Sequence, residues 1–255
     1  PNWPKVLGCW NAVLKVEPKQ PKALKKLFDY FYEMSDLGQN AWQQVQEYSE
    51  KLLEIQREQG QVDPEVLLAH GRAALEIARA GAVTYRQEIL SEAVKDFQEY
   101  AQLQPQDAQA YRYLAEAKLV QGEIEGSRGN LQGSQTARRD AMVILEDGVQ
   151  QADDKAEAWA QKFNFQLQFA GDPVVSTDPN ELDLLRQQIL QLAKELPPDD
   201  RIYSALARSY ERPGNLNQSR SLDLGIQAIQ KAVELDPDNV FHYLHLANLL
   251  YRKSS

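Results

Sequence analysis

The chain has 255 residues but only one cysteine, Cys9. No internal disulfide can form, and a metal site built from cysteine ligands is excluded. Cys9 lies in the apolar stretch VLGCWNAVL, where no partner base is suggested. We therefore expect it to be a small buried residue of a helix rather than a nucleophile.

Long hydrophobic runs and an excess of positive charge are also missing. No run of eighteen apolar residues occurs, so no membrane insertion is expected. The chain carries 28 Lys and Arg against 37 Asp and Glu, a formal net charge of -9. That balance argues against a nucleic-acid partner, because binding phosphates requires a local excess of cations. The mean hydropathy of -0.56 suits a thin repeat protein, which has more surface per residue than a globule.

Motifs for catalysis and cofactor binding are lacking as well. The segment GSRGNLQG at 126–133 follows a predicted helix rather than a strand, and it has no Gly-Lys-Ser/Thr ending. It is therefore not a phosphate-binding loop. The acidic pairs 153–154 and 199–200 lie in turns, where carboxylates cap the helices that follow. We expect no catalytic residue and no cofactor.

Histidine is scarce, with three residues: His70, His242 and His245. His242 and His245 are three positions apart, so they could share one face of a helix, as metal ligands do. Two donors do not complete a site, and the nearby Asp238 is better placed to cap the helix. We expect both histidines to face solvent or line a groove, with no metal bound.

The sequence does contain a repeated register. Six residues after a turn proline comes an aromatic residue, followed three and four positions later by Leu and Ala. This pattern occurs three times, as Tyr111-Leu114-Ala115, Tyr203-Leu206-Ala207 and Tyr243-Leu246-Ala247. Spacings of three and four place each set on one face of a helix.

The segment before each turn keeps a second register. A small residue recurs at one position and a bulky residue lies one turn further on. The sets are Ala93-Phe97-Tyr100, Ala141-Leu145-Gly148 and Gly225-Ile229-Ala232. A small residue lets two helices approach closely, so each unit should be a pair of packed helices.

These positions resemble the fingerprint of the tetratricopeptide repeat (TPR) family. The match is best over 200–247, good over 108–122 and 141–153 apart from Lys118, and weaker over 21–56 and 64–104. The unit led by Trp159 departs, because Lys162 and Phe163 stand where Leu and a small residue belong, and we expect a locally shifted helix there. The turns are 48, 44 and 40 residues apart, whereas the family period is about 34. That spacing also suits HEAT-like repeats, but the small residues in both helices favour the tetratricopeptide pattern.

The resemblance implies an all-α fold, a right-handed α-solenoid of stacked antiparallel helix pairs. We expect a single array over 1–255, with about five or six pairs. The first residues read as a second helix of a pair and the last as a first helix, so we expect a fragment of a longer protein, or further parts that are disordered.

Extra residues should form loops within the pairs, at 122–135, 171–181 and 212–221, along one rim of the solenoid. These segments are rich in Gly, Ser, Asn and Pro. Asp178, Pro179 and Glu181 form a helix-start pattern, and so do Asp63 and Pro64.

The function that the resemblance implies is a protein-interaction scaffold that binds a peptide or partner domain on its concave face. The family register assigns six residues to that groove: Arg112, Glu116, Asn164, Arg208, Leu244 and Asn248. No Lys is followed by Asn four positions later, which argues against a chaperone-tail receptor. Two alternatives stay open: a substrate-docking or regulatory arm of a larger enzyme such as a glycosyltransferase, and a self-assembly module that forms homo-oligomers through its exposed ends.

Overall fold

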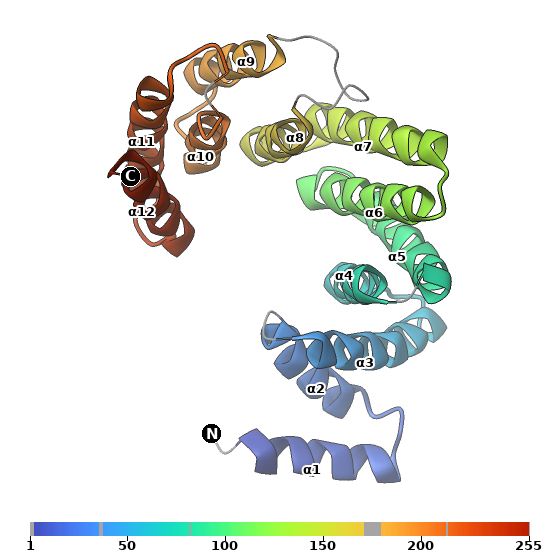
Figure 1. Cartoon of the computed structure of the whole chain (residues 1–255). Helices are drawn as coiled ribbons and strands as arrows, with labels where there is room; N and C mark the ends of the chain where they lie inside the picture. Colours follow the sequence, from blue (N-terminus) through green and yellow to red (C-terminus); the bar gives the residue numbers. More distant parts are fainter. Residues whose placement is uncertain (1–2, 36–37, 82, 171–179, 213, 255) are drawn as a thin grey trace. The chain divides into compact units, whose positions relative to one another are not determined.

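The computed structural model describes residues 3–35, 38–81, 83–170, 180–212 and 214–254. All the secondary-structure elements among them are helices (Figure 1). The chain divides into two compact units, an N-terminal unit, Pro1–Ala141, and a C-terminal unit, Met142–Ser255. The boundary falls within one helix, α7, and each unit is described by itself below.

The N-terminal unit contains six helices and the first half of α7. They are α1 (Trp3–Val16), α2 (Pro21–Glu33), α3 (Gln39–Glu58), α4 (Pro64–Ala80), α5 (Val83–Leu103), α6 (Ala108–Ser127) and α7 (Leu131–Gln151). From α1 to α6, consecutive helices contact each other, and α4 also contacts α6 across the intervening α5. This is the order expected when α2, α4 and α6 are the first helices of stacked pairs.

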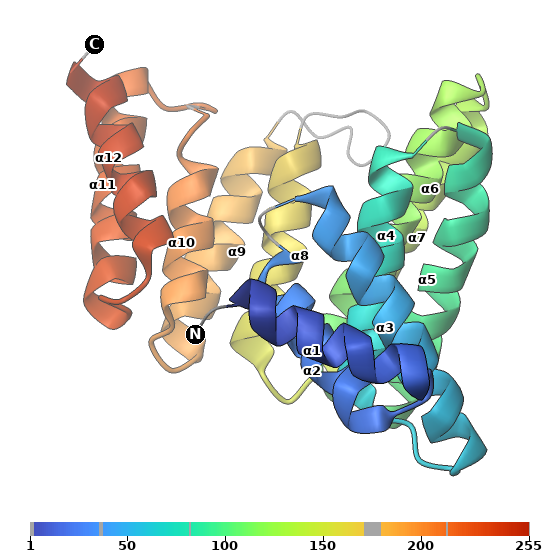
Figure 2. The ribbon, with the colours of Figure 1, turned by 90° about the horizontal axis from the view of Figure 1, so that it is seen from below.

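The C-terminal unit contains the rest of α7 and five further helices. They are α8 (Lys155–Phe169), α9 (Glu181–Glu195), α10 (Asp200–Ser209), α11 (Gln218–Leu235) and α12 (Val240–Ser254). Helix α10 contacts α8, α9 and α11, and α11 contacts α12, so the last three helices lie side by side (Figure 2). The prediction of an all-α helical repeat is confirmed, including the helix pairs expected over 21–56 and 64–104.

The helices start where the sequence places capping residues. The Asp63 carboxylate accepts a hydrogen bond from the Glu65 N–H at 2.9 Å, and Pro64 occupies the first turn, as predicted. Asp154 and Asp199 cap α8 and α10 in the same way. Such a cap satisfies an N–H that has no partner within the helix.

The cap of α12 differs from the prediction. The side chain of Asn239, not of Asp238, accepts the hydrogen bond from the Phe241 N–H, at 3.1 Å. The chain turns one residue later than the sequence suggested, and Asp238 instead donates its own N–H to Asp236.

The small residues of the repeat register lie at close helix contacts. Ala93, Ala141 and Ala207 are fully buried, and a Cβ on Gly225 of α11 would lie 3.3 Å from Cβ of Tyr210. Large apolar side chains fill the space one turn away, as Phe97 and Ile229 do. Each unit therefore has a continuous apolar core along its helix pairs.

The prediction of a long loop at 122–135 is wrong. Helix α6 continues to Ser127 and α7 begins at Leu131, which leaves only a short turn around Gly129, where φ is +80°. A Cβ on Gly122 would lie 3.2 Å from that of Ala137, so this glycine serves a close helix contact rather than a loop.

The other two predicted insertions have different outcomes. The loop at 212–221 is confirmed over its first part, because α10 ends at Ser209 and α11 begins at Gln218, capped by Asn217. The insertion predicted at 171–181 lies largely outside the described residues, and so do Asp178 and Pro179. Glu181 opens α9.

Two further expectations concern single helices. Cys9 is exposed rather than buried, because α1 turns Leu7, Trp10 and Leu14 toward the core and leaves Cys9 outside. The sequence predicted a locally shifted helix in the unit led by Trp159. Helix α8 is continuous there, and it buries Phe163 at the position where the family has a small residue. Among the described helices, none is long and apolar enough to span a bilayer.

Candidate functional site: the exposed face of the first helices

The six residues predicted to line a groove are shared between the two units. Arg112 and Glu116 lie on α6 of the N-terminal unit. The other four belong to the C-terminal unit: Asn164 on α8, Arg208 on α10, and Leu244 and Asn248 on α12. All six are at least partly exposed.

In the N-terminal unit, Arg112 and Glu116 form an ion pair, with Nε 2.8 Å from Oε1. The second carboxylate oxygen of Glu116 accepts a hydrogen bond from Arg79 on α4, also at 2.8 Å. Glu116 thus joins arginines of two neighbouring helices. The guanidinium of Arg112 also lies 5.1 Å from the ring centroid of Tyr113.

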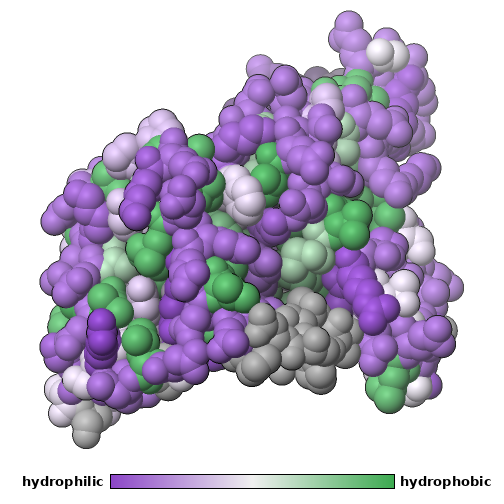
Figure 3. Space-filling view, turned by 90° about the horizontal axis from the view of Figure 1, so that it is seen from above, coloured by the Kyte–Doolittle hydropathy of each residue, from purple (hydrophilic) through white to green (hydrophobic). Residues whose placement is uncertain are grey.

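In the C-terminal unit, Arg208 donates a hydrogen bond to the side-chain oxygen of Asn164 at 3.3 Å. Leu244 is 60% exposed, and Asn248 lies one turn further along the same face of α12. Leu244 belongs to a row of exposed apolar residues on that helix, with Val240, Phe241, Tyr243 and Leu250. On the face of the molecule shown in Figure 3, by contrast, hydrophobic residues are scattered among hydrophilic ones.

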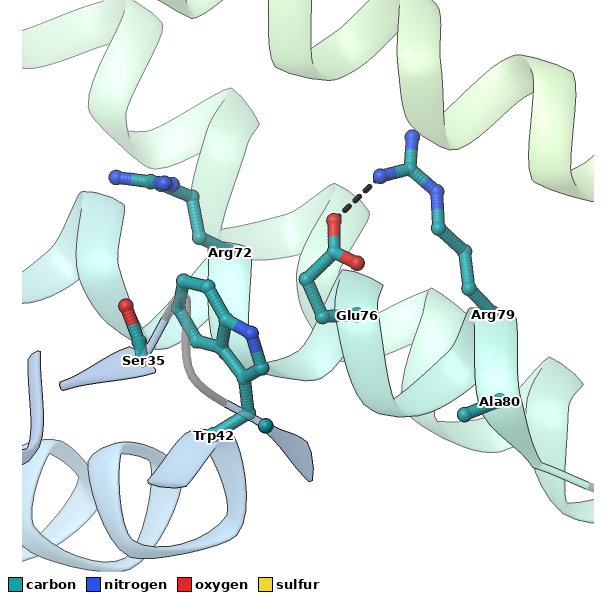
Figure 4. A pocket seen from close by; sticks show the side chains of 7 residues that line it. Ser35, Trp42, Arg72, Glu76, Arg79 and Ala80 are labelled. Atoms are coloured by element: carbon teal, nitrogen blue, oxygen red, sulfur yellow. Dashed lines mark hydrogen bonds and ion pairs between the residues drawn. The ribbon is translucent and has the colours of Figure 1, made fainter. Parts of the chain in front are cut away.

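A pocket of about 520 Å³ opens in the N-terminal unit (Figure 4). Helix α4 supplies four of the seven described lining residues, and Ser35, Gly38 and Trp42 supply the rest. The lining residues are Ser35, Gly38, Trp42, Arg72, Glu76, Arg79 and Ala80. We call this the Arg72 pocket.

The guanidinium of Arg72 is surrounded by aromatic rings. It lies 5.3 Å from the ring centroid of Tyr32, 5.4 Å from Trp42 and 5.4 Å from Tyr113. These rings come from α2, α3 and α6, so Arg72 of α4 contacts three other helices. Trp42 and Tyr113 are buried, which fixes the rings around the charge.

Arg72 uses few of its hydrogen-bond donors within the protein. It donates to the Tyr32 hydroxyl. Within the described part of the chain, no carboxylate lies within ion-pair distance of it, and the nearest acid of the pocket, Glu76, is paired with Arg79 instead (Figure 4). A guanidinium has five N–H donors in a flat fork, so several remain for a ligand.

Arg79, unlike Arg72, is paired with two carboxylates, those of Glu76 and Glu116. Burial lowers its pKa, but the hydrogen bond to Glu116 and the charge of Glu76 outweigh burial, so the pKa of Arg79 is raised. The pKa of the buried Tyr113 hydroxyl is also raised, because the effect of burial exceeds the opposing effect of Arg72 and Arg112. Arg79 is thus held by two acids, and Arg72 is the cation open to a ligand.

Sequence reasoning missed this pocket. Arg72, Glu76 and Arg79 follow at intervals of four and three, which places them on one face of α4. The segment matches the repeat fingerprint weakly, so the register assigns no groove residue to it. The charged face of the helix was the signal available, but Trp42 and the tyrosines become its neighbours only through folding.

The sequence predicted that His242 and His245 face solvent or line a groove, and His242 does not face solvent. His242 is 5% exposed, and its Nε2 lies 2.8 Å from a carboxylate oxygen of Asp200. His245 Nε2 lies 3.0 Å from Oε1 of Glu211. This contact lowers the pKa of the Glu211 carboxyl more than burial raises it. Both carboxylates belong to the preceding repeat, which explains why neighbours along the sequence did not reveal them.

His70 also has an acidic partner. Its Nδ1 lies 2.6 Å from Oδ2 of Asp96, and both side chains are largely buried between α4 and α5. Of the His, Cys, Asp and Glu side chains that the structure describes, one group brings three donors close enough for a metal ion: Asp200, Asp236 and His242.

Comparisons with known proteins bear on the fold. No family model matches the chain, and no curated protein matches its sequence. A solved structure of a thermophilic TPR protein from Thermus thermophilus is similar, with a TM-score of 0.57 and 18% identity over 89% of this chain and 99% of the other. A MamA fragment from Desulfovibrio magneticus gives a TM-score of 0.36 at 20% identity, over 72% of this chain and 85% of that one. The chain has the fold of a tetratricopeptide-type helical repeat.

Proposed function

We propose that this chain is a protein-interaction scaffold, not an enzyme, and that it binds a peptide or partner domain on the exposed face of its first helices. The observation that carries the proposal is Arg72, a cation without a carboxylate partner among the described residues, which lies in a pocket beside Trp42. The ligand that fits it is the side-chain carboxylate of an Asp or Glu in the partner.

The energetics favour a carboxylate at this position. Hydrogen bonds between two ionised groups are roughly twice as strong as neutral ones, and the guanidinium fork matches a carboxylate with two parallel bonds. The rings of Tyr32, Trp42 and Tyr113 hold Arg72 in place, so little side-chain entropy is lost on binding. Stacked, partly buried arginines and aromatic residues are also enriched among the residues that dominate binding at interfaces.

The net charge of -9 limits which partners can bind. A uniformly acidic partner would be repelled by most of the surface, so the attraction has to be local. The proposal is therefore a peptide with one acidic side chain placed among neutral or basic residues. Arg112 and Glu116 would contact the same peptide in the N-terminal unit, and Asn164, Arg208, Leu244 and Asn248 would serve partner contacts in the C-terminal unit.

The test is selection from a library of random short peptides, followed by fluorescence anisotropy on the selected sequences. We expect an Asp or Glu to be enriched at one position. Arg72→Met, which keeps the apolar stem against the rings, should weaken binding by about tenfold or more, equivalent to about 1.4 kcal/mol.

The matched control is Arg57→Met. Arg57 lies on α3 and pairs with Glu99 of α5 at 2.8 Å, so it is an exposed, paired cation of the second helices. Its loss should leave peptide affinity unchanged. Failure to enrich an acidic position, or equal losses in both variants, would contradict the proposal.

A further inference from the structure

Three side chains from separate elements of the C-terminal unit converge at one end of its last helices. Asp200 is the first residue of α10, Asp236 follows the last residue of α11, and His242 lies in the first turn of α12. One donor atom from each lies within 4.8 Å of the other two. His242 is largely buried, and Asp200 and Asp236 are partly buried.

The charges at this point do not balance. Asp200 and Asp236 bring two carboxylates to one histidine, and among the described residues neither carboxylate has a Lys or Arg ion-pair partner. The nearest arginine along the chain, Arg201, turns to other acids: its guanidinium donates to Asp199, Asp154 and Glu157. Two converging carboxylates repel each other in a partly buried site unless a cation lies between them.

We propose that Asp200, Asp236 and His242 form a binding site for a divalent transition-metal ion, with zinc as the ion that fits the donor set best. One imidazole nitrogen and two carboxylate oxygens are ligands that zinc accepts, whereas calcium and magnesium favour oxygen donors alone. The neutral imidazole and the two carboxylates would bring the site to charge balance with a dication.

The geometry needs only small adjustments. Zinc bonds of 2.0–2.1 Å in a tetrahedron separate the ligand atoms by about 3.3 Å. The distance between His242 Nε2 and Asp200 Oδ2 is 2.8 Å, and the wider pairs lie within 4.8 Å, so the donors already surround a volume of the right size. Water would complete the coordination.

The bound ion would link the last three helices of the C-terminal unit. The three ligands join α10, the end of α11 and the start of α12, which also contact each other through the apolar core and through ion pairs such as that of Lys253 with Asp223. Because a ligand that binds only the folded state stabilises it by mass action, zinc should raise the melting temperature in a concentration-dependent way. This site is independent of the Arg72 pocket, which lies in the other unit.

The test uses the whole chain, freed of metal with a chelator that is then removed. Zinc chloride is added during thermal unfolding followed by circular dichroism, and binding is measured by calorimetry. We expect one zinc ion per chain and a higher melting temperature. Asp236→Asn should weaken zinc binding by more than about tenfold, the loss that removal of an outer-shell partner already causes.

Asp236→Asn is the preferred variant because its side-chain oxygen can still accept the Asp238 N–H. His242→Gln is the second variant. The matched control is Glu211→Gln, which alters the neighbouring His245 pair, where a single carboxylate meets a histidine. Zinc binding should survive that change.

The proposal is overturned if zinc produces neither heat nor a shift in melting temperature. It is also overturned if the shift persists in both Asp236→Asn and His242→Gln, or if Glu211→Gln removes it equally. In the metal-free state, the Asp236→Asn variant should melt no lower than the unaltered chain, because one of two repelling charges is removed, and this separates lost metal binding from lost folding.

Discussion

Gly71 on α4 lies so close to Phe97 on α5 that a Cβ on the glycine would be 2.7 Å from Cε1 of the phenylalanine ring. The ring cannot give way easily, because Phe97 is fully buried and stacks on Tyr113 with a centroid distance of 5.3 Å. The absence of a side chain at Gly71 is therefore a condition for the α4–α5 contact.

The first prediction is that Gly71→Ala destabilises the protein. Overpacking of this kind costs about 1–3 kcal/mol, which is set against a gain of about 1 kcal/mol from the better helix propensity of alanine. We expect a net loss in the free energy of unfolding, measured in urea. Gly8→Ala is the control, because no atom lies within 4 Å of the added Cβ on α1. That variant should be neutral or slightly more stable, and equal effects at the two sites would refute the packing argument.

The second prediction concerns the repeat register at Ala207. This residue is fully buried, and its carbonyl oxygen lies 3.5 Å from the position of a Cβ on Gly225. Ala207→Leu should therefore cost roughly 1–3 kcal/mol in urea unfolding. Ala247 occupies the same register position on α12 but is exposed, so Ala247→Leu should change stability by less than about 0.5 kcal/mol. A loss near zero for Ala207→Leu would show that the register is assigned wrongly.

Much of the fold could be predicted from the sequence because its signals are local. The spacing of Leu206 and Ala207, repeated elsewhere, encodes a helix face, and Asp63 before Pro64 encodes a helix start. Glycine was a less reliable signal. Gly122 marks a tight contact between α6 and α7 rather than a loop, since glycine serves both purposes and only the neighbouring helix distinguishes them.

The Arg72 pocket and the contact of His242 with Asp200 depend on neighbours that are distant in sequence, and for that reason they could not be predicted. Arg72 is an ordinary charged residue until Trp42 and Tyr113 surround it. His242 had no acidic partner one turn further along its own helix, whereas the fold brings Asp200 to within hydrogen-bond distance of it. A helical repeat places side chains of successive repeats next to each other, and a search along one helix does not find such pairs.

The third prediction is a pH dependence at Asp154. Burial alone would raise the pKa of this carboxyl, but hydrogen bonds from Arg201 and from the Glu157 N–H outweigh burial and lower it. A carboxyl whose pKa is lower in the folded state stabilises the fold above its unfolded pKa of about 3.9, and that contribution is lost as the pH falls through the folded pKa.

Asp154→Asn keeps a side-chain oxygen for the helix cap and removes the charge. We expect it to lower the urea midpoint at pH 7 and to have a progressively smaller effect as the pH falls below the unfolded pKa of about 3.9, where the contribution of the carboxylate is lost. The stabilisation is modest, because the side chain is half exposed and water screens the pair. Asp153→Asn is the control at the adjacent exposed position and should show little change at either pH. An Asp154→Asn effect that grows as the pH falls would contradict the assigned sign.

The last prediction ranks the arginines of the exposed face. Arg112 is already paired with Glu116, and Arg208 is hydrogen-bonded to Asn164, so part of each guanidinium is committed within the protein. Exposed pairs of this kind contribute about 0–1 kcal/mol, so Arg112→Ala and Arg208→Ala together should leave the urea midpoint nearly unchanged.

For the peptides selected with the intact chain, the double variant should lose less affinity than Arg72→Met. Anisotropy titrations of both variants against one selected peptide with a single acidic side chain make the comparison. A larger loss in the double variant would move the main contact from the Arg72 pocket to the groove predicted from the sequence. Unchanged affinity in both would mean that partners bind outside the face of the first helices.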